Sequence, residues 1–268
     1  MKRDFSHLII CWYEANKRDL PWRHTTDPYR IWVSEIILQQ TRVGQGLSYY
    51  QRFIDRYPDV GSLAMAEEED VMKLWQGLGY YSRARNMHQA AQIIAGSNQA
   101  GFPASYAELK KIKGVGDYTA SAVSSIAYGE PQPVVDGNVL RVMARYAGIR
   151  EPVNTTTAKK KVREILAGMI DPLKPGIFNQ AVMELGAVIC KPRQPLCGQC
   201  PVIQDCYAFR NKLTAELPVI KKVKDLSLRY FNYLVILNRQ GKYNYTWLKK
   251  RTGNDIWKNL YDFPLIET

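Results

Sequence analysis

The chain has 268 residues, which allows one large domain or two of ordinary size. Hydrophobic residues make up 46% and charged residues 23%, and these near-average values disfavour disordered, collagen-like and coiled-coil chains. Lysine and arginine total 37 against 25 acidic residues, so the net charge of +12 favours a polyanionic partner or an anionic surface. No apolar run reaches the roughly 18 residues of a membrane span, and no apolar signal core follows Met1. We therefore expect a cytoplasmic protein without a targeting signal.

Most of the chain is predicted to be helical, because apolar residues recur at three- and four-residue spacing between turn signals. Asp27 and Pro28 are typical of a helix start, with a capping aspartate followed by proline in the first turn. The helix that they open runs through Ile37. Further helices are predicted, in chain order, over 66–76, 82–94, 106–112, 118–127, 139–146, 158–170 and 178–189.

The character of the chain changes near its end. Residues 219–229 resemble a basic linker, and 230–237 has the apolar and aromatic composition of a strand. Residues 243–248 are predicted to pair with that strand as a hairpin across 238–241. Only 44 residues follow from Asp225, too few for an independent core, so this part is either an appendage or an uncompleted second domain.

Four cysteines lie within 17 residues, at Cys190, Cys197, Cys200 and Cys206. In a reducing compartment such a cluster indicates a metal site rather than two disulfides. Four thiolates suit either zinc or a [4Fe–4S] cluster, and the number of ligands does not distinguish them. Structural zinc more often uses two C-x2-C pairs, whereas only one is present here, so the unequal spacing favours iron–sulfur.

A lysine-rich segment contains a Gly-x-Gly turn at Gly114 and Gly116. A helix, a glycine turn and a second helix together direct backbone amides toward a phosphate. The pattern alone also fits a tight turn between helices. The flanking lysines and the net charge favour nucleic acid.

Two carboxylates have surroundings that suit catalysis. Glu35 lies among apolar residues, where burial would raise its pKa as a general acid requires, although an exposed position at the helix edge is the alternative. Asp136 precedes Gly137 and is expected to cap the next helix, held ionised by backbone amides. One neutral acid and one fixed anion are the pair that cleaves a glycosidic bond.

These motifs, in this order, closely resemble those of the MutY-type adenine DNA glycosylases, within the helix-hairpin-helix superfamily that includes endonuclease III. The resemblance covers residues 1–218. It rests on the motifs Leu20–Arg23, Trp32–Thr41, Gly77–Arg85, the Gly114 hairpin, Val135–Val139, Phe178–Gln180 and the four cysteines.

The resemblance implies a mainly α fold, a two-lobed helix-hairpin-helix glycosylase with a four-cysteine iron–sulfur loop and a short, incomplete β-rich C-terminal segment. The first residues would pack with the 135–218 lobe that carries the cluster, and 27–134 would form the other lobe. Residues 230–268 resemble the start of the family's Nudix-like domain, which helps to read 8-oxoguanine. By this resemblance, residues 230–268 would form only part of that domain.

The implied activity is monofunctional: hydrolysis of the bond to adenine mispaired with 8-oxoguanine or guanine in double-stranded DNA, by a monomer. Bifunctional relatives carry a lysine where this chain has Tyr118. A glycosylase with lyase activity of the endonuclease III type, or a non-catalytic iron–sulfur DNA-binding module, are the alternatives.

Individual residues take roles by the same resemblance. Glu35 would protonate the flipped adenine, Asp136 would stabilise the sugar cation, and Tyr118 would lie beside Asp136. The four cysteines would hold a [4Fe–4S] cluster. Residues implied to contact the substrate or the DNA are Trp22 and Arg23 in the pocket wall, Gln40, Thr41, Leu78 and Tyr80 at the opposite base or the gap in the stack, and Leu38, Gly114, Gly116 and Gln180.

Overall fold

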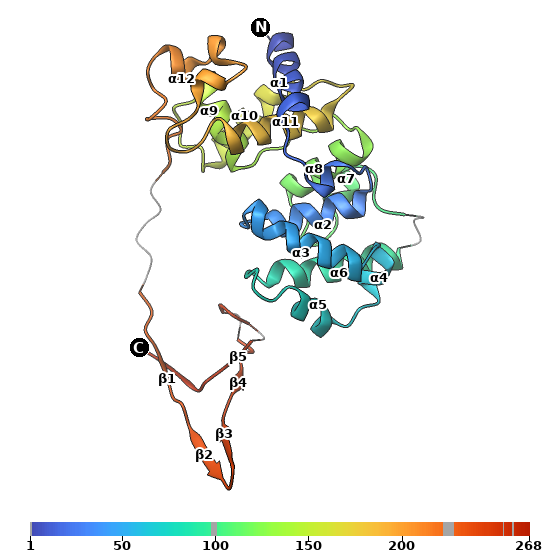
Figure 1. Cartoon of the computed structure of the whole chain (residues 1–268), viewed down its shortest axis with the longest axis vertical. Helices are drawn as coiled ribbons and strands as arrows, with labels where there is room; N and C mark the ends of the chain where they lie inside the picture. The colour runs from blue at the N-terminus through green and yellow to red at the C-terminus, as the bar shows by residue number, and fades with distance from the viewer. Residues whose placement is uncertain (1, 98–100, 222–227, 254, 259) are drawn as a thin grey trace. The chain divides into compact units, whose positions relative to one another are not determined.

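The computed structural model describes residues 2–97, 101–221, 228–253, 255–258 and 260–268. The chain divides into two compact units, Met1–Lys221 and Lys222–Thr268. All the helices belong to the first unit and the strands to the second, as far as the described residues extend (Figure 1). Residues 222–227, which make up most of the predicted basic linker, lie outside the described part of the chain.

One lobe of the helical unit is built on a core that runs from Leu20 to Val123 and is centred on Trp32, Phe53 and Trp75. These side chains are almost fully buried, and aromatic rings pack edge to face between Phe53 and Trp75. The helices of this lobe are α2 (Pro28–Leu38), α3 (Val43–Arg56), α4 (Val60–Ala64), α5 (Glu68–Leu74), α6 (Ser82–Gly96), α7 (Tyr106–Leu109) and α8 (Asp117–Tyr128).

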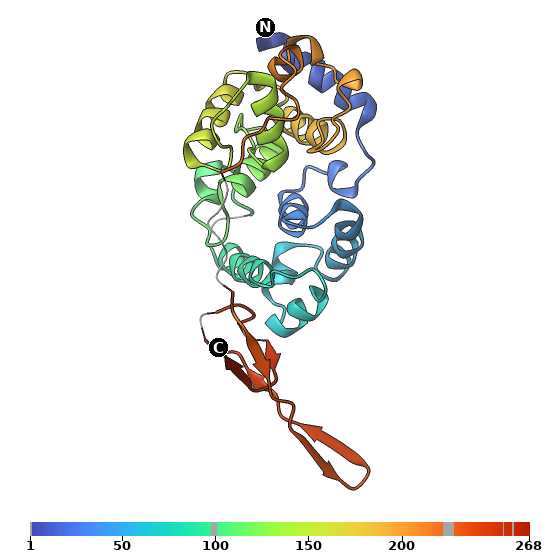
Figure 2. The same cartoon turned by 90° about the vertical axis from the view of Figure 1, so that its left-hand side faces the viewer.

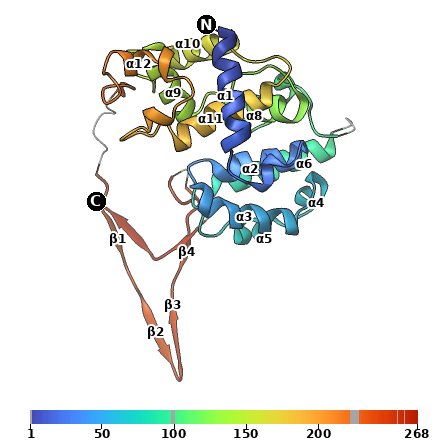
Figure 3. The ribbon, with the colours of Figure 1, turned by 45° about the horizontal axis from the view of Figure 1, so that its top comes forward.

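The other lobe brings the start of the chain together with a much later part. Phe5 of the first helix packs against Phe178 and Tyr146 in a second core. Figure 2 shows the blue first helix among the yellow and orange helices of this lobe, and Figure 3 shows α1 beside α11. The helices here are α1 (Lys2–Asn16), α9 (Gly137–Ala147), α10 (Thr156–Ala167), α11 (Pro175–Val188) and α12 (Tyr207–Arg210).

Helix α8 joins the two lobes, because it packs against both α2 and α11. The approach to α11 is close: a Cβ atom added to Gly176 would lie 2.7 Å from the Cα of Ile126. Asn179 of α11 donates to the Ser125 hydroxyl at 2.9 Å and accepts from the Val134 amide at 3.1 Å. These contacts fix the lobes on either side of the space in which the candidate site lies.

The structure confirms the mainly helical fold class and the predicted helices, with shifted ends. The predicted helix 66–76 is shorter, at Glu68–Leu74, and the predicted helix 158–170 ends at Ala167. Helices α1 and α3 were not predicted, although α3 presents Tyr50, Phe53 and Ile54 to the core at helical spacing. None of the helices in the described residues combines the length and apolar character needed to cross a bilayer.

The described residues of the second unit form three two-stranded antiparallel sheets. They pair β1 (Phe231–Tyr233) with β6 (Leu265–Glu267), β2 (Leu237–Gln240) with β3 (Tyr243–Thr246), and β4 (Lys249–Lys250) with β5 (Tyr261–Asp262). The predicted hairpin of 230–237 with 243–248 is wrong in part. Phe231–Tyr233 pairs with β6 instead, and the strand that pairs with Tyr243–Thr246 is Leu237–Gln240, so residues 238–240 are not loop. The turn consists of Gly241 and Lys242, because Gly241 supplies the positive φ of +60° that a two-residue hairpin needs.

Candidate active site

Helix α2 carries Glu35 into the interior. The Asp27 carboxylate caps this helix by accepting from the amides of Tyr29 and Arg30, and Pro28 occupies its first turn. Every residue of the helix from Ile31 to Ile37 is buried, so both of its faces are covered. Glu35 is therefore only 7% exposed, which distinguishes it from a carboxylate on a solvated helix edge.

A cavity of about 190 Å³ lies between the lobes, and Glu35 is one of the residues that line it. Asp136, from the start of α9, lines the same cavity, so the two carboxylates share one space. Residues from both lobes form its walls. Tyr118, predicted to act with the two carboxylates, also lines the cavity. The lining residues predicted from the sequence to contact substrate or DNA are Trp22, Arg23, Leu38, Thr41 and Gln180.

The Glu35 carboxyl group is protonated more readily than an ordinary glutamate. Burial raises its pKa to about 7, and the neighbouring Asp136 charge raises it too. A hydrogen bond from Tyr118 and the positive charge of Arg23 act in the opposite direction. At neutral pH a large fraction of Glu35 is thus the neutral acid, in the state that can give a proton away.

The Tyr118 hydroxyl donates to Oε2 of Glu35. Burial and the nearby carboxylates raise the pKa of Tyr118 well above its ordinary value, so the phenol stays a donor. The sequence led us to expect Tyr118 beside Asp136, whereas its hydrogen bond goes to Glu35. Because Oε2 accepts this bond, the other carboxyl oxygen, Oε1, is the one available to carry a proton.

Asp136 is the N-cap of α9. Its Oδ1 accepts from the Val139 amide at 2.6 Å, and its Oδ2 accepts from the Asn138 side chain at 2.9 Å. The sequence predicts that backbone amides keep Asp136 ionised, and burial works against this. Burial raises the pKa of Asp136, while these hydrogen bonds and the Arg141 guanidinium oppose the rise.

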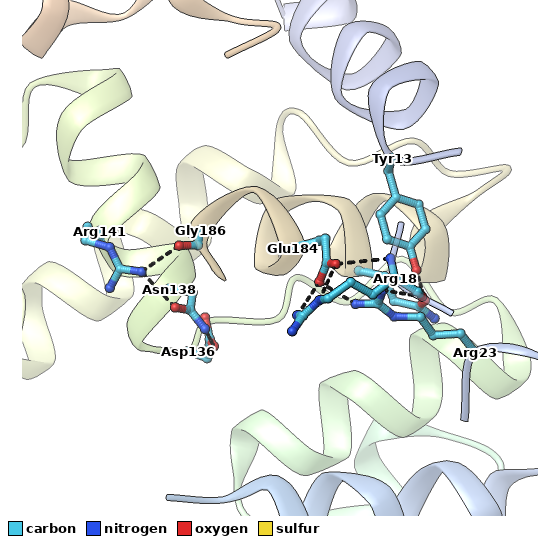
Figure 4. A network of polar contacts seen from close by, with 9 residues as sticks. Tyr13, Arg18, Arg23, Asp136, Asn138, Arg141, Glu184 and Gly186 are labelled. Carbon is cyan, nitrogen blue, oxygen red and sulfur yellow. Dashed lines mark hydrogen bonds and ion pairs between the residues drawn. The ribbon is translucent and has the colours of Figure 1, made fainter. Parts of the chain in front are cut away.

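A buried ion cluster forms one wall of the cavity (Figure 4). Glu184 of α11, 1% exposed, accepts from Arg18 Nε and Nη2 at 2.7 Å each and from Arg23 Nη2 at 2.6 Å. Burial alone would raise the pKa of Glu184, but the two guanidinium groups hold it at about 2. Two cations against one anion leave this wall positively charged.

The lysine-rich turn lies between α7 and α8. Gly114 has a φ of +89°, and a Cβ there would meet the Cβ of Asn86 at 2.9 Å, so both the conformation and the space require glycine. Gly116 is the N-cap of α8 and leaves the amides of that helix end without a side-chain cap. Lys110 pairs with Asp117 at 2.6 Å. These residues do not line the cavity with Glu35.

The four cysteines occupy the segment between α11 and α12. Cys190, Cys200 and Cys206 are partly buried against the core of the second lobe. Burial and the neighbouring cysteines raise the pKa of the Cys200 thiol to about 11. Arg145, only 3% exposed, donates from Nη1 to Cys190 Sγ at 3.3 Å and to the Lys191 carbonyl at 2.7 Å. The positive charge of Arg145 would stabilise a thiolate at Cys190, the ionised form that binds a metal.

Among the described residues, no three Cys, His, Asp or Glu side chains approach closely enough to share a single metal ion. The Cys190, Cys197 and Cys206 thiols all raise the pKa of Cys200, so the four cysteines lie near one another. Four thiolates are the donor set of a [4Fe–4S] cluster, which takes one cysteine at each iron, and also of a structural zinc ion.

Comparison with known proteins assigns the chain to a family. The model described as "HhH-GPD superfamily base excision DNA repair protein" matches residues 33–172. An adenine DNA glycosylase of Buchnera aphidicola subsp. Schizaphis graminum is 38% identical over 269 residues, which span 98% of this chain and 75% of that protein. The chain belongs to the adenine DNA glycosylase family.

A further relative and two solved structures are also similar to this chain. The human adenine DNA glycosylase is 41% identical over 221 residues, 79% of this chain and 40% of the human protein. A thermostable thymine-DNA glycosylase of known structure matches with a TM-score of 0.72 and 28% identity, over 78% of this chain and 97% of that one. A non-covalent endonuclease III–DNA complex, at 20% identity and a TM-score of 0.66, shares the fold.

Several residues expected at the DNA interface of this adenine DNA glycosylase family member lie away from the cavity. Tyr80 is 63% exposed, while Leu78 is 8% exposed and packs in the first core. Gln40 follows the end of α2. Gln40 and Tyr80 both have left-handed backbone, with φ of 57° and 46°. Gly114 and Gly116 mark the hairpin described above.

The sequence reasoning missed Glu184 and Arg18, although both line the cavity. A signal for Glu184 was present: a lone carboxylate on α11 among Ala181, Val182 and Leu185, the same feature that singled out Glu35. Arg18 gave no comparable signal, because it lies in a polar segment after α1.

Proposed function

We propose that this chain is a monofunctional adenine DNA glycosylase of base-excision repair that releases adenine opposite 8-oxoguanine or guanine by hydrolysis. The observation that carries the proposal is the shared cavity of Glu35 and Asp136, two carboxylates in different environments. Membership of the adenine DNA glycosylase family supports adenine as the base.

The chemistry follows from the two carboxylates. An adenine extruded from the duplex enters the cavity, and an adenine in a mispair is extruded at lower cost. Glu35 gives the proton on Oε1 to the base, at N7, which makes adenine a better leaving group. The glycosidic bond breaks with its electron pair remaining on adenine. The Asp136 carboxylate stabilises the positive charge on the sugar until water adds at C1′ and loses a proton to the Glu35 carboxylate.

The residues around the two carboxylates support Glu35 as the acid and Asp136 as the anion. Tyr118 holds the Glu35 carboxyl in one orientation. Arg23, fixed by Glu184, limits the rise of the Glu35 pKa and forms the wall with Trp22.

The cavity distinguishes hydrolysis from lyase chemistry. A bifunctional glycosylase attacks the sugar with an amine, and no lysine is among the described residues that line this cavity. Tyr118 cannot form a Schiff base. A non-catalytic DNA-binding module would have no use for a buried glutamic acid aimed into a cavity.

We propose double-stranded DNA as the partner. The net charge of +12 and the exposed amides at the start of α8 suit a phosphate backbone. Gln40, Thr41, Leu78 and Tyr80 are proposed to act at the opposite base, and the segment from residue 230 as part of a domain that reads 8-oxoguanine. The protein would act in the cytoplasm, at the bacterial nucleoid.

We further propose that Cys190, Cys197, Cys200 and Cys206 hold a [4Fe–4S] cluster. The cluster would tie the end of α11 to α12 and so stabilise the second lobe, supplying structure rather than chemistry at the base. Arg145 would hold the loop in place through its bonds to the Lys191 and Pro192 carbonyls. Iron and acid-labile sulfide in the purified protein support this, and stoichiometric zinc contradicts it.

The activity is tested by incubating the full chain with a duplex that carries adenine opposite 8-oxoguanine or guanine. We expect free adenine and strand breaks that appear only after alkali, since hydrolysis leaves an intact abasic strand. Breaks without alkali, together with borohydride trapping of a covalent complex, would instead indicate the bifunctional mechanism. Tight binding of the duplex without release of adenine would indicate the non-catalytic module.

A further inference from the structure

The guanidinium group of Arg83 contacts backbone carbonyls of two separate segments. From its place near the start of α6, Nη1 donates to the carbonyls of Ile36 at 2.9 Å and Ile37 at 3.1 Å, and also to that of Gln39. These groups belong to the end of α2, where a helix leaves carbonyls without partners of their own. Arg83 therefore caps the helix that carries Glu35.

The second segment is the turn between α5 and α6. Arg83 Nη2 donates to the carbonyls of Leu78 at 3.4 Å and Gly79 at 3.3 Å. The Arg83 Cζ atom lies 5.2 Å from the Trp75 ring centroid and 5.8 Å from that of Tyr80. One side chain thus binds the end of α2 and the turn that presents the exposed Tyr80.

Both segments contain a residue in an unfavourable conformation. Gln40 and Tyr80 have φ of 57° and 46°, and a residue other than glycine keeps such backbone only where its surroundings hold it. Gln40 is adjacent to Gln39 and Tyr80 to Gly79, whose carbonyls Arg83 binds. Arg83 therefore binds the backbone directly beside both residues with left-handed conformation.

The two terminal nitrogens of the Arg83 guanidinium donate to these carbonyls, whereas its Nε is buried without a hydrogen-bond partner. Within the described ranges of the chain no ion pair involves Arg83, and partial burial lowers its pKa. Lysine could not replace it, since only the planar fork of arginine reaches two segments at once.

We propose that Arg83 is a positioning residue that holds the Tyr80 turn in register with the helix of the general acid, so that extrusion of the base delivers adenine to Glu35. The proposal rests on the proposed function. It predicts that Arg83 matters when the base must be extruded, and matters little once the base is already unpaired.

The test compares two substrates in single turnover, adenine opposite 8-oxoguanine and adenine opposite an abasic site, with the variants Arg83→Lys and Arg83→Gln. A displacement of about 1 Å costs about a hundredfold in rate, and we expect a loss of that order on the paired adenine. On the unpaired adenine we expect a loss of about threefold or less, because the chemistry is unchanged. The fluorescence of 2-aminopurine at the target position should rise less on binding than with the wild type.

Arg85→Gln is the matched control, because Arg85 lies on the same helix but pairs with Glu68 at the surface at 3.1 Å. It should behave as the wild type on both substrates. Equal losses on both substrates, no loss on either, or failure of both Arg83 variants to fold would overturn the proposal. If the wild type releases adenine from neither substrate, the proposed function fails instead.

Discussion

Replacing Glu35 by Gln is expected to lower the single-turnover rate of adenine release by about 10²- to 10⁴-fold, the usual contribution of a positioned general acid. Glutamine keeps the shape of the side chain and can still accept the Tyr118 hydrogen bond, but it has no proton to give. Duplex binding should stay near the wild-type value, since Glu35 is buried and contributes no charge to a phosphate. Quenched-flow measurement of released adenine checks the predicted loss of rate. A binding titration checks that duplex binding is unchanged.

Folding provides an internal control for this variant. The pKa of Glu35 is raised in the folded state, so the ionised form opposes folding and stability falls as pH rises from about 4.5 to about 7. Glutamine cannot ionise, and the variant should melt no lower than the wild type above neutral pH. Glu69→Gln, an exposed substitution on α5, is the matched control for activity. A wild-type rate in Glu35→Gln would rule out Glu35 as the acid.

Replacing Asp136 by Asn is expected to slow adenine release by about 10²- to 10³-fold, the scale of losing one electrostatic contact to a charged transition state. Asparagine caps a helix about as well as aspartate, so α9 should keep its start and the melting temperature should change little. The loss then reports the missing charge rather than a damaged fold. The measurement is again release of adenine under single turnover.

Asp59→Asn is the matched control for this second variant. Asp59 caps α4 through the Ser62 amide at 2.8 Å and does not line the cavity, so activity should be unchanged. If Asp136→Asn kept full activity, Asp136 would be a cap alone. If it lost activity only in proportion to its stability, the electrostatic role would be wrong as well.

The sequence predicted most of what depends on local patterns. The Asp27–Pro28 start, the buried position of Glu35 and the Asp136 cap all follow from neighbours within one or two helical turns. The helical fold class followed from apolar spacing in the same way. Helix α3 was overlooked in spite of an equally clear pattern, so that omission had no physical cause.

What the sequence did not predict depends on contacts between distant residues. Glu184 meets Arg18 and Arg23 across separations of 166 and 161 residues. Tyr118 bonds to Glu35 across 83 residues, so its partner could not be inferred from either segment alone. The raised pKa of Asp136 has the same origin, because the burial that causes it arises only when the lobes close around the cavity.

Release of adenine by this site depends most directly on a neutral Glu35, whose pKa of about 7 is set by burial and by Tyr118, Asp136 and Arg23. The measurement that tests it is the single-turnover rate of adenine release by the wild type between about pH 6 and about pH 9. Since the protonated acid is the active form, the rate should fall as pH rises through about 7, and the residual rate of Glu35→Gln should lack this fall. A wild-type rate that stays level or increases across this range would contradict the account.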